Sequence, residues 1–179
     1  GLFATTTKVL DRLALDVTDA RIMTLDNGYT LDTYVVLEED SGEMVRGESR
    51  REEIRSALVA ALCHGTVPNQ RLVVGQRRVR AFSVPTQVQF KPDSKTGLTR
   101  LSVFTGDRQG LLSLIGQAMQ DAGIRLHHAR VATFGERVED FFYISDEDGR
   151  PFDDSARQQA FIERFEGLLE AAKESPNKS

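Results

Sequence analysis

The sequence predicts an α+β fold in which two ferredoxin-like βαββαβ units follow one another, with antiparallel sheets and helices on one face. Three observations support this prediction. The chain repeats itself at an offset of about 109 residues. In both copies, segments of helix period alternate with segments of strand period. Both copies also contain the same slip in the apolar phase of a strand, which chance similarity would not produce.

Each copy contains an amphipathic helix at an equivalent position. Apolar residues recur at three-and-four spacing over residues 2–13 and again over residues 111–122. Gly1-Leu2-Phe3 aligns with Gly110-Leu111-Leu112, so the two helices begin at matching points of the repeat.

A bulged strand is predicted after each helix. In the first copy Leu15 and Val17 alternate, and the apolar phase then slips by one residue to Ala20 and Ile22. The second copy repeats this slip between residues 124 and 131. One extra residue reverses the inward phase of all that follows it in a strand. We therefore predict bulged strands over 15–25 and 124–134.

A hairpin and a second helix complete each copy. Turn residues at 26–28 and 135–136 precede strand patterns over 29–38 and 137–145. Helical spacing returns at 54–62 and 160–172. Gly65 and Pro68 are expected to end the first of these helices.

Two β-type runs, 84–90 and 98–105, lie between the copies. We assign the first run to the end of the first unit and the second run to the start of the next, which gives units of 1–90 and 91–179. The first unit then lacks its N-terminal strand, and the second lacks its last. We expect the two incomplete sheets to lie edge to edge, because this would cover open strand edges.

Composition limits the classes of function. With 179 residues, 40% hydrophobic and 28% charged, the chain is typical of a globular protein. A net charge of −4 argues against nucleic acid as a partner. No apolar run approaches the ~20 residues that cross a membrane. We expect a cytoplasmic protein without disulfides, because Cys63 is the single cysteine.

The segment Asp107-Arg108-Gln109-Gly110-Leu111-Leu112 connects a predicted strand to a helix. Asp107 is placed to cap the helix, and Gly110 would allow a ligand to approach the backbone closely. Amide groups at a helix N-terminus favour a carboxylate such as that of an α-amino acid. An ordinary helix cap without a ligand accounts for the same residues.

These residues carry a resemblance to a known family. The strand, the loop 107–112, the helix and the pattern from Gly123 to Val131 resemble the ACT domain, a regulatory module that binds amino acids. The resemblance extends to a particular group of ACT proteins through the tandem arrangement and through residues 82–90 and 135–142. From Leu2 onward the chain is similar to the C-terminal end of bacterial bifunctional PII-protein uridylyltransferase/uridylyl-removing enzymes.

The resemblance implies that bound glutamine restrains uridylyl transfer and promotes uridylyl removal in upstream catalytic domains. It also implies PII protein as a partner of the full enzyme and homo-oligomers formed through the sheets. Carried over by position, the ligand-binding residues are Asp107, Arg108, Gly110, Leu111, Leu112, Asp16 and Arg125. Asp16 and Arg125 are charged at a position where other ACT domains commonly have an amide or a hydroxyl. The resemblance therefore does not decide which copy binds the ligand. Gly1 falls inside the first copy's loop motif, so we expect the missing strand and the catalytic domains to precede it.

No catalytic residue, metal site or cofactor is assigned to this chain, and Mg²⁺ is expected only for the absent catalytic domains. Asp146 and Asp148 have Asp-x-Asp spacing, but Gly149 follows and favours a solvated turn. His127 and His128 fall at the predicted bulge, where a structural role is favoured. Cys63 and His64 lack a third group to orient them.

Other interpretations remain. The pair could be a structural or dimerising module without a ligand, or a free-standing tandem protein. Phe141 and Tyr143 share a strand face, which is typical of platforms for single-stranded RNA, but we expect them to pack between sheets or beneath a helix. A basic segment containing Arg77 and Arg78 could dock on the acidic segment 136–154 or on the catalytic domains.

Overall fold

The computed structural model describes residues 1–174 except 26, 70–84, 107, 109 and 135–136. In this part of the chain, helices and strands follow one another in the order that the repeat predicts. They are α1 (Leu2–Arg12), β1 (Leu15–Thr24), β2 (Thr30–Glu38), α2 (Glu48–His64), β3 (Gln87–Asp93), β4 (Leu98–Gly106), α3 (Leu111–Asp121), β5 (Arg125–Phe134), β6 (Arg137–Ser145) and α4 (Ser155–Glu174).

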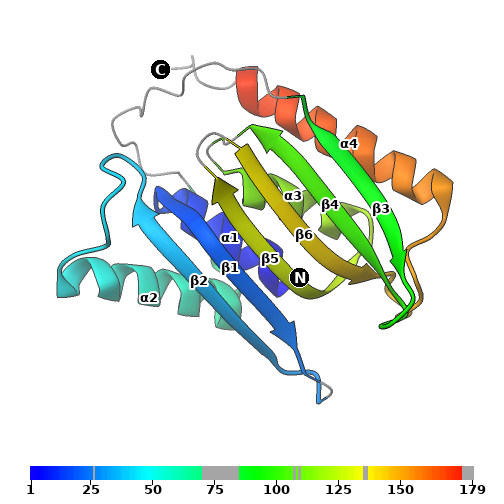
Figure 1. The fold of residues 1–179 in the computed structure, drawn as a ribbon. Helices are drawn as coiled ribbons and strands as arrows, with labels where there is room; N and C mark the ends of the chain where they lie inside the picture. Colours follow the sequence, from blue (N-terminus) through cyan, green and yellow to red (C-terminus); the bar gives the residue numbers. More distant parts are fainter. Residues whose placement is uncertain (26, 70–84, 107, 109, 135–136, 175–179) are drawn as a thin grey trace.

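The described strands form one antiparallel sheet of six strands in the order β2-β1-β5-β6-β4-β3. All of the described helices lie on one face of this sheet (Figure 1). The two copies meet where β1 pairs with β5, with Arg21 opposite Arg130. This confirms the α+β class and the prediction that the two half-sheets lie edge to edge.

Both predicted bulges are present. The register of β1 against β2 shifts between Val17 and Asp19, and that of β5 against β6 shifts between Leu126 and His128. Thr18 and His127, the extra residues, occupy equivalent positions in the two copies. The bulge lets Leu15 and Ala20 both reach the helix-covered face, although they are an odd number of residues apart.

The β-type run predicted over 84–90 corresponds in its described part to the first residues of β3, Gln87–Asp93. β3 pairs with β4 at the edge of the sheet farthest from β2, and the boundary expected at residue 90 falls inside β3. A tight turn explains this, because Gly97 N donates to Asp93 O at 2.9 Å and Thr96 Oγ1 donates to Asp93 Oδ2 at 2.7 Å. Closing so short a hairpin costs less chain entropy than pairing with a distant strand.

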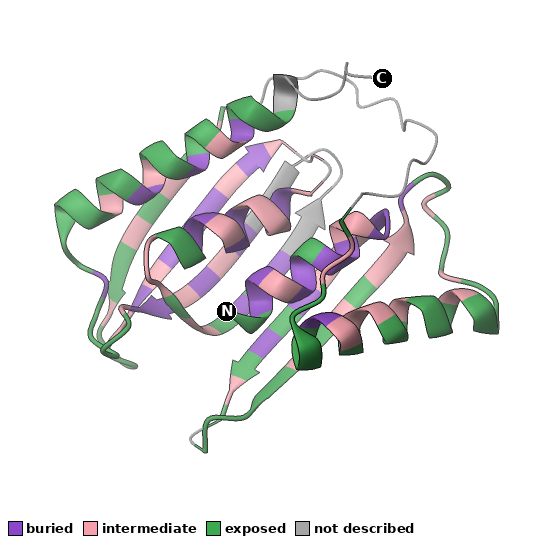
Figure 2. Ribbon diagram, turned by 180° about the vertical axis from the view of Figure 1, so that it is seen from behind, coloured by how far each residue is buried: buried purple, intermediate pink, exposed green. Residues whose placement is uncertain are grey.

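One hydrophobic core lies between the helices and the sheet and draws on both copies. Figure 2 shows the buried residues gathered on the inner sides of α1, α3 and α4 and on the strands beneath them. Phe3 from the first copy packs edge-on against Phe142 from the second, with ring centroids 5.9 Å apart. A smaller cluster that includes Val9, Leu10 and Leu13 packs under α2. The copies therefore share a core as well as a sheet.

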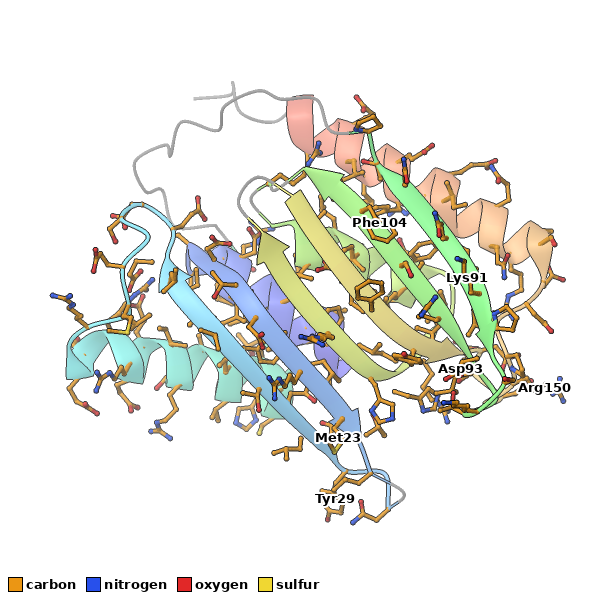
Figure 3. The ribbon with its side chains drawn as sticks, in the orientation of Figure 1. Met23, Tyr29, Lys91, Asp93, Phe104 and Arg150 are labelled. Carbon is orange, nitrogen blue, oxygen red and sulfur yellow. The ribbon has the colours of Figure 1, made fainter. Side chains whose placement is uncertain are left out.

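No described helix lies over the opposite face of the sheet (Figures 1 and 3). Phe141 and Tyr143 lie on this open face, since they alternate with Phe142 and Ile144, which are fully buried in the core. The expectation that they pack between sheets or beneath a helix is therefore wrong. They are half-buried against strand neighbours, and Phe141 contacts Phe104 edge-on.

Helices α1 and α3 approach closely at Gly116, which is buried. A Cβ atom on Gly116 would lie 2.9 Å from Ala4 Cα and 3.2 Å from Thr7 Oγ1. Glycine is needed here because the contacting atom Ala4 Cα belongs to the backbone and cannot rotate away. The helix layer of the two copies thus depends on this contact.

We expect Gly116→Ala to lower the free energy of unfolding by about 1–3 kcal/mol, because the added methyl overpacks the α1–α3 contact. Gly167→Ala is the matched control, since Gly167 is exposed in α4 with no atom within 4 Å of the added Cβ. The control should raise the free energy of unfolding by about 0.5–1 kcal/mol, because alanine favours a helix more than glycine does. Urea unfolding curves measure both, and equal effects of the same sign would contradict the packing argument.

Candidate functional site

A small cavity, which we call cavity A, lies where α1 and β1 of the first copy meet the start of α3 in the second. Its volume is about 40 Å³. It is lined by Thr7, Asp11, Leu15, Asp16, Val17, Arg108, Gly110, Leu111, Leu112, Ser113, Val131 and Asp140. The two copies therefore build this cavity together.

The N-terminus of α3 forms one wall of cavity A. The helix begins at Leu111 after Gly110, which has a left-handed backbone with φ of 67° and no side-chain cap among the described residues. Asp107, predicted to be that cap, lies outside the described residues. Amides in the first turn of a helix have no partner within the helix, and the helix dipole favours an anion there.

The first copy contributes Asp11 to this wall. A Cβ atom on Gly110 would lie only 2.7 Å from Asp11 Oδ1, so the carboxylate of α1 packs directly against the loop backbone. Gly110 is therefore favoured by its positive φ, and a side chain at this position would displace the Asp11 carboxylate.

The charged residues that line cavity A are Asp11, Asp16, Asp140 and Arg108, so acidic groups predominate among them. Asp16 lies near the start of β1, and Asp140 is completely buried on β6 opposite Val103. Arg108 is the basic residue of the lining, and its Nη1 donates to Leu169 O on α4 at 3.3 Å. A zwitterionic amino acid suits such a site, because the carboxylates can hold its ammonium group and the helix amides can hold its carboxylate.

A second cavity, cavity B, occupies the equivalent place in the repeat, between the start of α1 and the strand β5. Its volume is about 360 Å³. Gly1 replaces Gly110, Arg125 replaces Asp16, and Asp32 replaces Asp140. It is lined by Gly1, Leu2, Phe3, Ala4, Ile22, Thr24, Thr30, Asp32, Gly116, Met119, Gln120, Gly123, Ile124, Arg125, Leu126 and Glu147. The internal repeat thus relates the two cavities.

Cavity B differs from cavity A in charge. Arg125 lies at the rim, and its Nη2 donates to Glu147 O at 2.9 Å. Within the part of the chain that the structure describes, Asp32 Oδ1 is buried without a hydrogen-bond partner. Burial raises the pKa of the Asp32 carboxyl above its ordinary value, and the neighbouring Tyr34 hydroxyl partly opposes this.

The structure brings together most of the residues that the sequence singled out. Arg108, Gly110, Leu111, Leu112 and Asp16 line cavity A, whereas Arg125 lines cavity B.

Sequence reasoning missed Asp11, Asp32 and Asp140. The repeat held a signal for two of them, because Asp32 aligns with Asp140 and each precedes a run of apolar or aromatic residues. Nothing in the sequence pattern indicated that Asp11 would lie against Gly110.

The described residues contain no group of three or more His, Cys, Asp or Glu placed to hold a metal ion. Asp146 Oδ1 accepts hydrogen bonds from the amides of Asp148 and Arg150, which confirms a turn. His127 Nε2 lies 2.9 Å from Ser145 Oγ. Burial, followed by the charges of His128 and Arg125, lowers the His127 pKa. Among the helices of this part of the chain, none is both long and apolar enough to cross a membrane.

Comparison with known proteins finds several relatives that share one name. The chain is 40% identical over 172 residues to a bifunctional uridylyltransferase/uridylyl-removing enzyme of Stutzerimonas stutzeri, covering 92% of the chain and 19% of that enzyme. Its identity to the enzyme of the same name from Methylococcus capsulatus is 42% over 160 residues, which cover 89% of the chain and 18% of the enzyme. The enzyme of the same name from Acinetobacter baumannii is 37% identical over 176 residues, which cover 96% of the chain and 19% of that enzyme. No family model matches the chain, and no solved structure matches it.

The fold and the two related cavities define a tandem α+β protein in which two ferredoxin-like units share one sheet. The sequence comparisons specify it further. The chain corresponds to a region of the bifunctional uridylyltransferase/uridylyl-removing enzymes, and it spans about a fifth of the length of the curated relatives it matches.

We expect Asp32→Asn to stabilise the protein at pH 7. Because the folded-state pKa of Asp32 is raised, ionising it costs more in the folded than in the unfolded chain. The wild type therefore loses stability as the pH rises from the ordinary carboxyl range through the raised pKa. The advantage of the variant should be present at pH 7 and vanish near pH 3, where both forms are neutral. Urea unfolding at both pH values measures this, and a pH-independent difference would contradict it.

Proposed function

We propose that this chain is the amino-acid-sensing region of a bifunctional uridylyltransferase/uridylyl-removing enzyme, and that its ligand is glutamine. One observation carries the proposal: residues that the sequence assigned to a ligand loop in one copy and to a strand in the other line the same cavity. The chain then contributes regulation, and catalysis belongs to other domains of the longer enzyme.

The chemistry of cavity A suits an α-amino acid. The ligand carboxylate would accept hydrogen bonds from amides in the first turn of α3, where the helix dipole favours negative charge. Asp11 offers a carboxylate for the ammonium group, and Asp16 lines the same cavity. The ligand would therefore contact α1 and β1 of one copy and α3 of the other at once.

A ligand held by both copies couples binding to their relative position. Cavity A must widen to admit glutamine, since its volume of about 40 Å³ is far below the ~300 Å³ typical of small-molecule pockets. Widening would move α3 against α1. We propose that this movement reports glutamine to the catalytic domains, which use Mg²⁺ and modify the PII protein.

The small volume of cavity A also favours a second candidate function, in which the tandem units hold domains or subunits together and bind no ligand. In that case the close contact between Asp11 and Gly110 is a packing feature. Ligand binding and assembly therefore have to be measured on the same variants.

Three glycines with left-handed backbones allow a matched test by calorimetry with glutamine. A Cβ atom added to Gly110, in cavity A, would lie 2.7 Å from Asp11 Oδ1. One added to Gly123, in cavity B, would lie 3.0 Å from Glu147 Oε1. One added to Gly65 would have no atom within 4 Å. All three alanine variants bear a similar backbone cost of about 1–2 kcal/mol. We expect Gly110→Ala to weaken glutamine binding at least about tenfold, or ~1.4 kcal/mol, with little change for the other two.

The remaining outcomes are decisive. A loss of affinity confined to Gly123→Ala would move the ligand to cavity B. Absence of glutamine binding by the wild type up to millimolar concentrations, in the full-length enzyme as well, would reject the sensor. If Gly110→Ala instead alters the oligomeric state in sedimentation experiments, the structural role is supported.

A further inference from the structure

The open face of the sheet carries two adjacent rows of side chains that run across all six strands. The register of the strands sets both rows. The first row is Lys91, Arg100, Tyr143, His128, Met23 and Leu31. The second row is Gln89, Ser102, Phe141, Arg130, Arg21 and Thr33. With strands ~4.8 Å apart, each row spans about 24 Å.

These two rows contain four Lys or Arg residues and no acidic residue, although the chain has a net charge of −4. Arg21 and Arg130 face each other directly across the β1–β5 pair, an arrangement that is unfavourable for like charges. Asp19 lies 3.9 Å from Arg21, but both side chains are exposed, so this pair offsets little of the repulsion. Carboxylates placed over the two arginines from outside would neutralise it.

The end of the same face over β1 and β2 is apolar and exposed. Leu31 is 62% exposed, Val35 49% and Met23 48%. Figure 3 shows Met23 near the β1–β2 turn, with Tyr29 at the turn itself. Apolar and methionine side chains beside arginines are typical of surfaces that bind proteins.

The aromatic rings of this face favour a protein over a single-stranded nucleic acid. Phe104 and Phe141 pack edge-on with centroids 6.0 Å apart at 86°, and His128 and Tyr143 pack in the same way at 6.4 Å and 72°. The phenyl rings and Tyr143 are also half-buried. Base stacking requires accessible ring faces, and in each of these edge-on pairs one ring covers part of a face of the other.

We propose that the open sheet face docks a protein surface that carries carboxylates over Arg21 and Arg130 and over Lys91 on β3, and apolar side chains over β2. The occupant is another region of the longer enzyme, because the matched relatives extend far beyond this chain, which covers only 18–20% of their length. That the docked surface belongs to the longer enzyme rests on the proposed function. The two cavities lie on the helix side of the sheet, so docking leaves them open to ligand.

Zero-length cross-linking of the full-length enzyme tests the proposal. A carbodiimide joins a carboxylate to a lysine only when the two groups are in contact, and Lys91 lies at one end of the first row. We expect mass spectrometry to find Lys91 linked to Asp or Glu residues outside these 179 residues. Arg21→Glu with Arg130→Glu should reduce these links at least about fivefold, because the repulsion then acts on the docked carboxylates.

Arg46→Glu with Arg51→Glu is the matched control. It makes the same change of charge at two exposed arginines that are not in either row, and the links should persist. The proposal is overturned if Lys91 links only to acids within its own chain or to a second isotope-labelled copy, or forms no link. Binding of a fluorescein-labelled twelve-nucleotide oligouridine that Arg21→Glu and Arg130→Glu abolish would also overturn it. Glutamine calorimetry on the same variants separates failure of docking from failure of sensing.

Discussion

The pairing of β1 with β5 is the interaction on which the rest of the structure depends. Each copy supplies a strand edge that would otherwise be open, and the backbone hydrogen bonds between these two edges join the half-sheets into one. The same junction brings α1 beside α3, where Gly116 allows the backbones to touch, and it places Phe3 in a core with Phe142. Separating the copies would expose both the strand edges and this shared core.

Both cavities are consequences of this junction. Because the repeat places the start of α1 against the start of β5 and the start of α3 against the start of β1, each cavity takes helix and strand residues from both copies. The sequences of the two copies have diverged at these walls, with Asp16 in one cavity and Arg125 in the other. A symmetric backbone therefore carries two chemically different sites, and differential ligand binding needs no difference in fold.

Local patterns in the sequence predicted the helices, the hairpins and both bulges, because periodicity and a one-residue slip in phase are properties of neighbouring residues. Local patterns do not show which strands pair with one another. The pairing of β3 with β4 could not be predicted from residues 84–90, because a β-type run does not state which strand it pairs with. Phe141 and Tyr143 were expected to pack against another sheet or a helix. The alternation of residues shows that these two share a face of the sheet, but it does not show whether anything lies over that face.

The sequence by itself determined the repeat, the local elements and the glycine-containing loop that begins α3. Only the tertiary structure decided that Asp11 packs against Gly110, that Asp16 and Arg125 lie in separate cavities, and that the arginines of β1 and β5 face each other. The physical reason is distance along the chain. Side chains brought together by strand pairing and helix packing are about a hundred residues apart, and no local pattern of propensity or hydrophobicity records that approach.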